Sequence, residues 1–195
     1  IRSFILEDFN NDNNFDLAIS NYDSLQIHYG NGTSIFEVQT KMETEYAISR
    51  MQAVDFDKDN DSDLVVDSYN KMNLITNNNG NWTESLLLDD DFPDSYYTSI
   101  ADLDNNDVYD IVRQVATYDA DYNEFVHLIW YKNFENGAFS DTALILGNSE
   151  LTNFLIDDLD NDGLEDLLFL KNSDYLSGVI TVSYTHLRAH ETTSH

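Results

Sequence analysis

The sequence predicts an all-β fold, a β-propeller fragment of four-stranded antiparallel blades with about three blades complete and a fourth partial. Two recurring patterns predict it. An Asp-rich loop begins at positions 8, 55, 102 and 158, which is 47, 47 and 56 residues apart, and such a near-constant period indicates a repeat architecture. An Asn-Gly pair followed by an aromatic residue also recurs in the first three repeats, and Asn-Gly is a strong signal for a hairpin turn.

The first two strands of each repeat flank the Asp loop. Short strand-like segments precede the loops at 3–6, 51–54, 98–101 and 154–156. Apolar segments begin at the ninth loop residue, which is Asp16, Asp63, Asp110 or Asp166. A strand, a tight polar loop and a second strand form a hairpin, so each Asp loop is predicted to join the first two strands of its unit.

The third and fourth strands follow on either side of the Asn-Gly turn. Third strands are predicted at 25–29, 73–76 and 125–131, and fourth strands near 35–38, 82–87 and 139–146. The third repeat is longer because residues 117–124 form an insertion between its second and third strands. The fourth repeat reaches a third strand near 178–181.

A four-stranded sheet of this size cannot bury both faces alone, so the units must stack on their neighbours. Radial stacking gives a β-propeller, and a solenoid of small stacked sheets is the alternative. A closed propeller usually needs more blades than these. We therefore expect an open arc from a larger ring, and a chain that lacks its original start because it has no initiator Met.

The charge of the chain excludes some classes of partner. With 37 acidic and 9 basic residues the formal net charge is −28, and such a chain is repelled by nucleic acid and by anionic membrane surfaces. No apolar run approaches the roughly 20 residues of a spanning helix, so we expect no membrane insertion. The acidic balance fits both solubility in a salty medium and the presence of cation sites.

The Asp loops have the spacing of a calcium site. Side-chain oxygens recur at loop positions one, three, five and nine, and the backbone carbonyl at position seven can add another oxygen. Flexible coordination by oxygen alone suits Ca²⁺ better than Mg²⁺. The predicted metal ligands are Asp8, Asn10, Asp12, Asn14 and Asp16; Asp55, Asp57, Asp59, Asp61 and Asp63; Asp102, Asp104, Asn106, Val108 and Asp110; and Asp158, Asp160, Asp162, Leu164 and Asp166.

The sixth loop position requires a sharp turn. Gly163 occupies it in the fourth loop and is expected to have a positive φ, which Asn and Asp tolerate best among other residues. Asn13, Asn60 and Asp107 hold this position in the other loops. Loops two and four are ranked above one and three, because Asn10 and Asn106 replace carboxylates and fewer charges weaken calcium affinity.

Two other interpretations of the loops were weighed. Asp and Asn also stabilise turns without an ion, but three or four converging carboxylates repel one another unless a cation neutralises them. An EF-hand needs a bidentate Glu at position twelve. The residues there are Ile19, Val66, Arg113 and Phe169, so an EF-hand is excluded.

The segments DFDKDNDSDLVV and DLDNDGLEDLLFL resemble the calcium loops of FG-GAP/VCBS repeats, the blades of integrin-alpha-type propellers. The resemblance covers about residues 1–181. It implies a seven-bladed propeller in the full protein, Ca²⁺ in the loop between the first two strands, and a secreted or cell-surface role in adhesion or carbohydrate association. Residues 182–195 abandon the repeat pattern and resemble a translated sequencing adapter, so we expect a non-native tail there.

The sequence gives little support for catalysis. There is no Cys and no GxSxG motif, and His28 and His127 lie within predicted strands, so we expect no catalytic residues. Trp82, Trp130 and Tyr131 could stack on a sugar, although blade cores also use aromatic residues.

The sequence therefore favours two functions. The first is a calcium-binding extracellular repeat module for adhesion or for interaction with an unidentified protein or glycan. The second is the non-catalytic propeller part of a secreted polysaccharide-active enzyme. In both, the segment belongs to a larger propeller chain.

Overall fold

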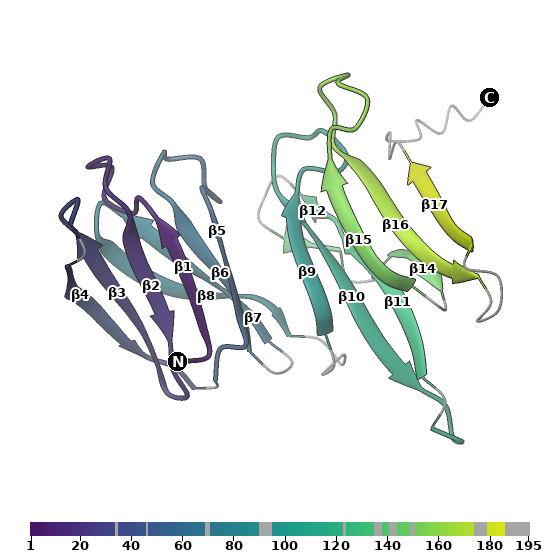
Figure 1. Cartoon of the computed structure of the whole chain (residues 1–195), viewed down its shortest axis with the longest axis horizontal. Helices are drawn as coiled ribbons and strands as arrows, with labels where there is room; N and C mark the ends of the chain where they lie inside the picture. The colour runs from purple at the N-terminus through teal and green to yellow at the C-terminus, as the bar shows by residue number, and fades with distance from the viewer. Residues whose placement is uncertain are drawn as a thin grey trace. The chain divides into compact units, whose positions relative to one another are not determined.

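The structure of the protein is a computed structural model that describes residues 1–33, 35–45, 47–68, 71–89, 95–122, 124–134, 138–140, 144–148, 151–173 and 179–185. The regular structure in these residues consists of antiparallel β-strands (Figure 1). The predicted all-β fold of four-stranded units is therefore confirmed. The chain forms two compact units, Ile1–Pro93 and Asp94–His195.

The first unit contains two complete four-stranded sheets, each a simple meander. The first sheet has the order β1 (Ser3–Glu7), β2 (Asp16–Ser20), β3 (Ser24–Gly30) and β4 (Phe36–Glu43). The second has the order β5 (Arg50–Val54), β6 (Asp63–Ser68), β7 (Lys71–Asn78) and β8 (Asn81–Asp89). In both sheets the second strand begins at the ninth loop residue, as predicted.

The second unit contains a four-stranded and a three-stranded sheet. The first is formed by β9 (Ser95–Ala101), β10 (Asp110–Tyr118), β11 (Glu124–Tyr131) and β14 (Leu144–Asn148). The second is formed by β15 (Leu151–Asp157), β16 (Asp166–Ser173) and β17 (Val179–Thr185). A short ribbon of β12 (Asn133–Phe134) and β13 (Ala138–Phe139) follows β11.

Three predicted boundaries differ clearly from the structure. The fourth strand of the first repeat, predicted near 35–38, continues to Glu43. The fourth strand of the third repeat, predicted near 139–146, is divided between β13 and β14, because β12 and β13 pair with each other before the chain returns to β11. Gly137, in the third Asn-Gly turn, lies outside the described residues. In the fourth repeat β17 continues beyond 181, with Val182 opposite Leu170 and Thr185 opposite Leu167, so it includes the first four residues of the predicted tail.

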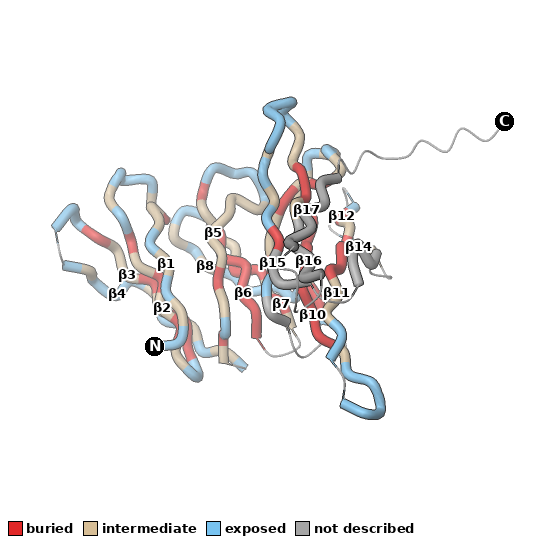
Figure 2. The backbone as a smooth tube through the Cα atoms, turned by 45° about the vertical axis from the view of Figure 1, so that its right-hand side comes forward, coloured by how far each residue is buried: buried red, intermediate tan, exposed pale blue. Residues whose placement is uncertain are grey.

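In each unit the two sheets share a hydrophobic core. In the first unit, Ala18 and Ile27 of one sheet cluster with Leu64 and Ile75 of the other. Phe9, only 1% exposed, lies in the same cluster and meets the Trp82 ring edge-on with centroids 5.6 Å apart. Figure 2 shows the contrast between the buried strands and the largely exposed Asp loops at their ends.

The core of the second unit joins its sheets in the same way. Leu128 and Trp130 cluster with Phe154 and Leu167 of the next sheet, and the rings of Tyr97 and Phe154 meet edge-on at 5.5 Å. Burial of one sheet face against the next is what four-stranded blades require. The Asp loops are thereby held at the ends of rigid strands.

Replacing Phe9 with Ala should destabilise the first unit by about 3–5 kcal/mol, the usual loss for a buried aromatic side chain whose cavity cannot fully collapse. Urea unfolding followed by tryptophan fluorescence measures this change. Phe15→Ala is the matched control, because Phe15 is 68% exposed and its truncation should change the stability by less than about 0.5 kcal/mol. Equal effects of the two substitutions would contradict the assigned core.

Candidate metal centre

All four Asp loops have the same backbone arrangement around the first aspartate. In the first loop the two carboxylate oxygens of Asp8 accept hydrogen bonds from the backbone amides of Asp12 (3.0 Å) and Asn13 (2.7 Å). In the fourth, Asp158 accepts from Asp162 (3.1 Å) and Gly163 (2.9 Å). Asp55 and Asp102 make the equivalent pairs of bonds. Each loop is therefore wrapped around its first carboxylate.

The wrapping requires two residues per loop in the left-handed region. At the sixth position Gly163 has φ 88°, and Asn13, Asn60 and Asp107 have φ between 65° and 73°. This confirms the turn predicted there and explains why Asn and Asp replace Gly. The fourth position also has a positive φ, at Asn11, Lys58, Asn105 and Asn161, a feature that the sequence analysis did not predict.

The ninth aspartate joins the loop to the third strand of its sheet. Asp16 is fully buried, and its two oxygens accept the backbone amides of Phe9 (3.0 Å), at the second loop position, and Gly30 (2.8 Å), at the end of β3. The equivalent amides belong to Asn77 of β7 for Asp63 and to Asn133, at the start of β12, for Asp110, both at 2.7 Å. These donors were not predicted, because a backbone donor leaves no residue-type signal.

Among these backbone donors, Gly30 is the one whose residue type is fixed by its position, so the sequence carries a signal for it. A Cβ atom at this position would lie 2.1 Å from the backbone oxygen of Phe15, which no real contact allows. The close approach brings the amide of Gly30 onto Asp16. Glycine is therefore needed at position 30 because a larger side chain would clash with the backbone of Phe15, and not because of its φ.

Three of the loops bring three carboxylates together. Positions one, three and nine each offer one oxygen, and in each loop the three oxygens lie within 4.8 Å of one another. Ca²⁺ binds oxygen at 2.3–2.6 Å, so two of its ligands are at most about 5 Å apart. The spacing and the chemistry of the donors fit one such ion per loop. The three groups are Asp55, Asp57 and Asp63; Asp102, Asp104 and Asp110; and Asp158, Asp160 and Asp166.

The other predicted ligands have different partners in the structure. At the fifth position Asp12, Asp59, Asn106 and Asp162 each accept the backbone amide of the seventh residue. At the seventh position, where a backbone carbonyl was predicted as the ligand, the side chain of Asp61 accepts bonds from Asn11 (2.8 Å) and from the amide of Asn79 (2.7 Å). The coordinating roles of positions five and seven stay predictions, including those of Asn14, Val108 and Leu164.

The first loop differs from the others at its third position. Asn10 stands there in place of a carboxylate, and its amide nitrogen donates to Asp12 at 3.3 Å. At positions one, three and nine the first loop therefore offers two carboxylates where each of the other loops offers three, and its lower rank as a calcium site stays a prediction.

Burial leaves three of the ninth carboxylates, Asp16, Asp63 and Asp110, poorly compensated without a cation. Loss of solvent raises the pKa of Asp63 to about 6, against the opposing effect of the backbone amides of Asn77 and Phe56. Burial likewise raises the pKa of Asp110 to about 6, with Asn133 and Trp130 opposing it. The pKa of Asp16 is raised by burial, and that of Asp57 by burial and then by the nearby charge of Asp59. A bound cation would stabilise the ionised forms.

The candidate sugar-stacking residues lie mainly in the core. Trp130 and Tyr131 are buried, and Trp82 packs against the core of the first unit. The core interpretation therefore holds for these three. His28 and His127 lie in strands as predicted, where they bond to Gln26 (3.2 Å) and Thr117 (2.8 Å). Within the described part of the chain, no helix is long and apolar enough to cross a membrane.

In calcium-free solution the stability contributed by Asp63 and Asp110 should fall as the pH rises from about 4 to about 7. Their folded-state pKa of about 6 exceeds the value of about 3.9 in an unfolded chain, so folding favours the protonated form and this stability is lost as the pH rises through 6. A difference of about 2 pKa units corresponds to about 3 kcal/mol per group, and partial screening by solvent should reduce the observed loss to on the order of 1–2 kcal/mol.

Thermal unfolding in a chelator across this pH range measures the effect. Asp63→Asn should flatten the pH dependence, whereas Glu37→Gln, at an exposed position, should leave it unchanged. An unchanged slope in Asp63→Asn would contradict the assignment of the buried carboxylate.

Comparison with known proteins supports the repeat and the fold. Residues 8–66 match the family model of the FG-GAP-like repeat. A solved structure of an Agrocybe aegerita lectin, described as the basis of specific recognition of non-reducing terminal N-acetylglucosamine, has a TM-score of 0.63 and 17% sequence identity, covering 93% of this chain and 52% of the lectin. The chain thus spans about half the length of that lectin, and no curated protein matches it. Residues 8–66 are therefore FG-GAP-like repeat sequence, and the chain has the β-propeller fold that its repeats predict.

Proposed function

We propose that this chain is a calcium-binding β-propeller module that acts outside the cell in adhesion, through contact with a protein or a glycan. The observation that carries the proposal is the convergence of three carboxylates in each of three loops with the same backbone arrangement. In the second and fourth loops the ligands would be the three grouped carboxylates, with the fifth and seventh positions completing the shell.

The donor set favours calcium over other metals. The grouped atoms are all carboxylate oxygens, whereas zinc and copper sites usually include His or Cys. Magnesium demands a shorter and more regular octahedral shell than a flexible loop provides. Calcium would compensate Asp63, whose burial raises its pKa, and would hold the loop against the end of the third strand.

The bound calcium ion would stabilise the fold of the blades, and the module itself would be non-catalytic. Calcium bound only by the folded state raises stability according to its concentration relative to Kd. Extracellular calcium modules work with Kd values of about 10⁻⁴–10⁻³ M, a range in which loops with few ligands can be occupied. The net charge of −28 also fits a surface that stays soluble in a salty medium.

The similarity to a lectin supports a glycan as one class of partner. The resemblance to integrin-type repeats supports a protein as the other. The non-catalytic part of a secreted polysaccharide-active enzyme is the second candidate function, and the same lectin similarity favours it. In either case the segment would act as part of a larger propeller.

Titration with Ca²⁺ should release or absorb saturable heat and raise the melting temperature. At a concentration of 100 times Kd one site adds about 2.7 kcal/mol to the stability. Isothermal titration calorimetry and thermal unfolding measure the two effects, and Mg²⁺ at the same concentration should produce smaller ones.

The loops can be assigned with single substitutions. Asp57→Asn and Asp160→Asn should each remove one site or weaken it at least about tenfold, because each removes a charged ligand at the third loop position. Glu37→Gln is the surface control and should bind as the unmodified protein does. Absence of both heat and a melting shift in the unmodified protein would refute calcium binding.

A further inference from the structure

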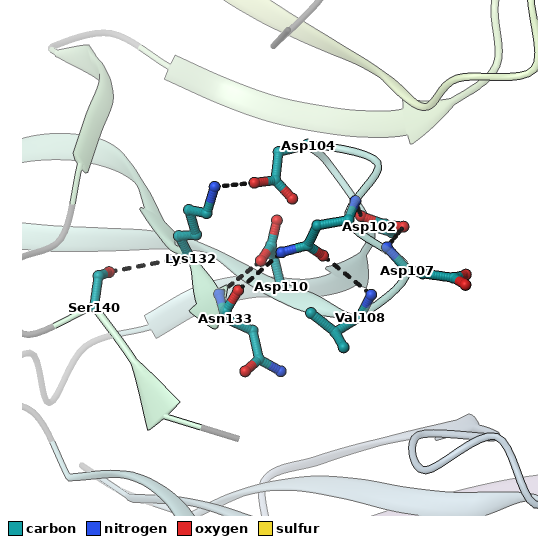
Figure 3. A network of polar contacts seen from close by, with 9 residues as sticks. Asp102, Asp104, Asp107, Val108, Asp110, Lys132, Asn133 and Ser140 are labelled. Atoms are coloured by element: carbon teal, nitrogen blue, oxygen red, sulfur yellow. Dashed lines mark hydrogen bonds and ion pairs between the residues drawn. The ribbon is translucent and has the colours of Figure 1, made fainter. Parts of the chain in front are cut away.

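A lysine that follows the third strand of the third repeat pairs with the Asp loop of that repeat. Lys132 follows directly after β11, and its ammonium group forms an ion pair with Asp104, the third-position carboxylate of this loop (Figure 3). The side chain of Asp104 is only 3% exposed, and that of Lys132 is 31% exposed. The pair is therefore shielded from solvent, which separates it from an ordinary surface salt bridge.

The residue equivalent to Lys132 can be found in other repeats, because it precedes the residue whose backbone amide binds the ninth aspartate. The residue after Lys132 is Asn133, whose amide donates to Asp110. The equivalent amides in the first and second repeats belong to Gly30 and Asn77. The residues that precede these two are Tyr29 and Thr76. Among the three repeats in which this donor is described, only the third has a lysine directly before it, whereas Lys58 of the second repeat lies at the fourth position of its loop.

The backbone of Lys132 is fixed by the ribbon that follows it. Its amide donates to the hydroxyl oxygen of Ser140 at 3.2 Å, and its carbonyl accepts the amide of Ser140 at 2.8 Å. The ribbon of β12 and β13 brings Ser140 back to this point. Since the base of the side chain is held in this way, less conformational freedom is lost when the ammonium binds Asp104.

The lysine opposes a divalent ion in two ways. It occupies the Oδ2 atom of Asp104, one of the three carboxylates that form the group. It also places a positive charge beside the site, and like charges a few ångströms apart repel strongly in a partly buried position. The other oxygen of Asp104, Oδ1, is buried and makes no hydrogen bond, so it could serve a metal ion once the lysine is removed.

We propose that Lys132 is a built-in counter-ion that takes the place of calcium in the third loop. The lysine neutralises Asp104 and leaves the buried Asp110 without a partner charge, and this is enough for the third loop to hold its fold without a metal ion, while the second and fourth loops depend on one. That the second and fourth loops bind calcium rests on the proposed function. The role of Lys132 as a counter-ion of Asp104 does not rest on it.

The first experiment measures calcium binding at the third loop. Trp130 lies near enough to Asp110 to lower the pKa of that carboxyl, so in a Trp82→Phe background its fluorescence reports on this loop. With Lys132 present, Ca²⁺ that saturates the calorimetric signal should leave the emission of Trp130 unchanged. With Lys132→Met, calorimetry should show one additional site, and the emission should change at the same calcium concentration. Equal responses with and without the lysine would overturn the proposal.

The second experiment needs no calcium and separates this proposal from the proposed function. In a chelator, Lys132→Met should lower the melting temperature by several degrees, because it leaves the buried Asp104 without its partner charge. Adding Asp104→Asn to this variant should recover most of the loss. Lys41→Met, which removes an exposed ion pair with Glu43, should have almost no effect.

The two experiments have separate outcomes. An unchanged melting temperature in Lys132→Met, or no recovery in the double variant, would refute the counter-ion. If no loop binds calcium in any variant, the proposed function fails, and the melting temperatures in chelator still decide whether Lys132 compensates Asp104.

Discussion

Each blade of this protein depends on one buried carboxylate, the ninth residue of its Asp loop. In the first blade Asp16 holds the start of the loop through Phe9 and the end of the third strand through Gly30. A charged group in this position loses its hydration, and the two backbone amides compensate only part of that loss. The remaining compensation must come from a positive charge or from a proton, which links the folding of the blade to the ionic composition of its surroundings.

Hydrogen bonds at the Asp loops also join the neighbouring blades within the first unit. The side chain of Asn77 donates to the backbone oxygen of Phe9 at 2.8 Å, while its own amide binds Asp63. Asn11 of the first loop donates to Asp61 of the second. The loops are therefore part of the contact between the two sheets, above the shared hydrophobic core. A change in one loop acts on its neighbour through these bonds.

The loops share one backbone but differ in the charge that they offer. Asn10 reduces the number of carboxylates in the first loop, and Lys132 supplies a cation to the third. Both departures leave the hydrogen bonds to the first and ninth aspartates in place. The backbone of the loop can thus be conserved within the chain while its demand for a metal ion varies. In a repeat protein the charge of one loop can change in this way while the packing between neighbouring repeats is kept.

The sequence by itself determined the repeat, the strands and the composition of the loops. Hydrophobic alternation, the spacing of Asp and the Asn-Gly turns are local signals, and local signals are sufficient to place the hairpin that begins at Asp63 or Asp166. The left-handed turn at Gly163 was predictable for the same reason. Local signals also located the carboxylates at positions one, three and nine that the structure gathers in three of the loops.

Only the tertiary structure showed which groups meet across the blade. The amides of Asn77 and Asn133 reach the ninth aspartates from strands 14 and 23 residues away, and any residue except proline can supply a backbone amide. Lys132 is distant in sequence from Asp104 and adjacent to it in space only because β11 returns beside the loop. The β12–β13 ribbon was missed because two short strands with little hydrophobic pattern give no periodic signal. Contacts of this kind depend on sheet register and strand ends, which composition and spacing do not specify.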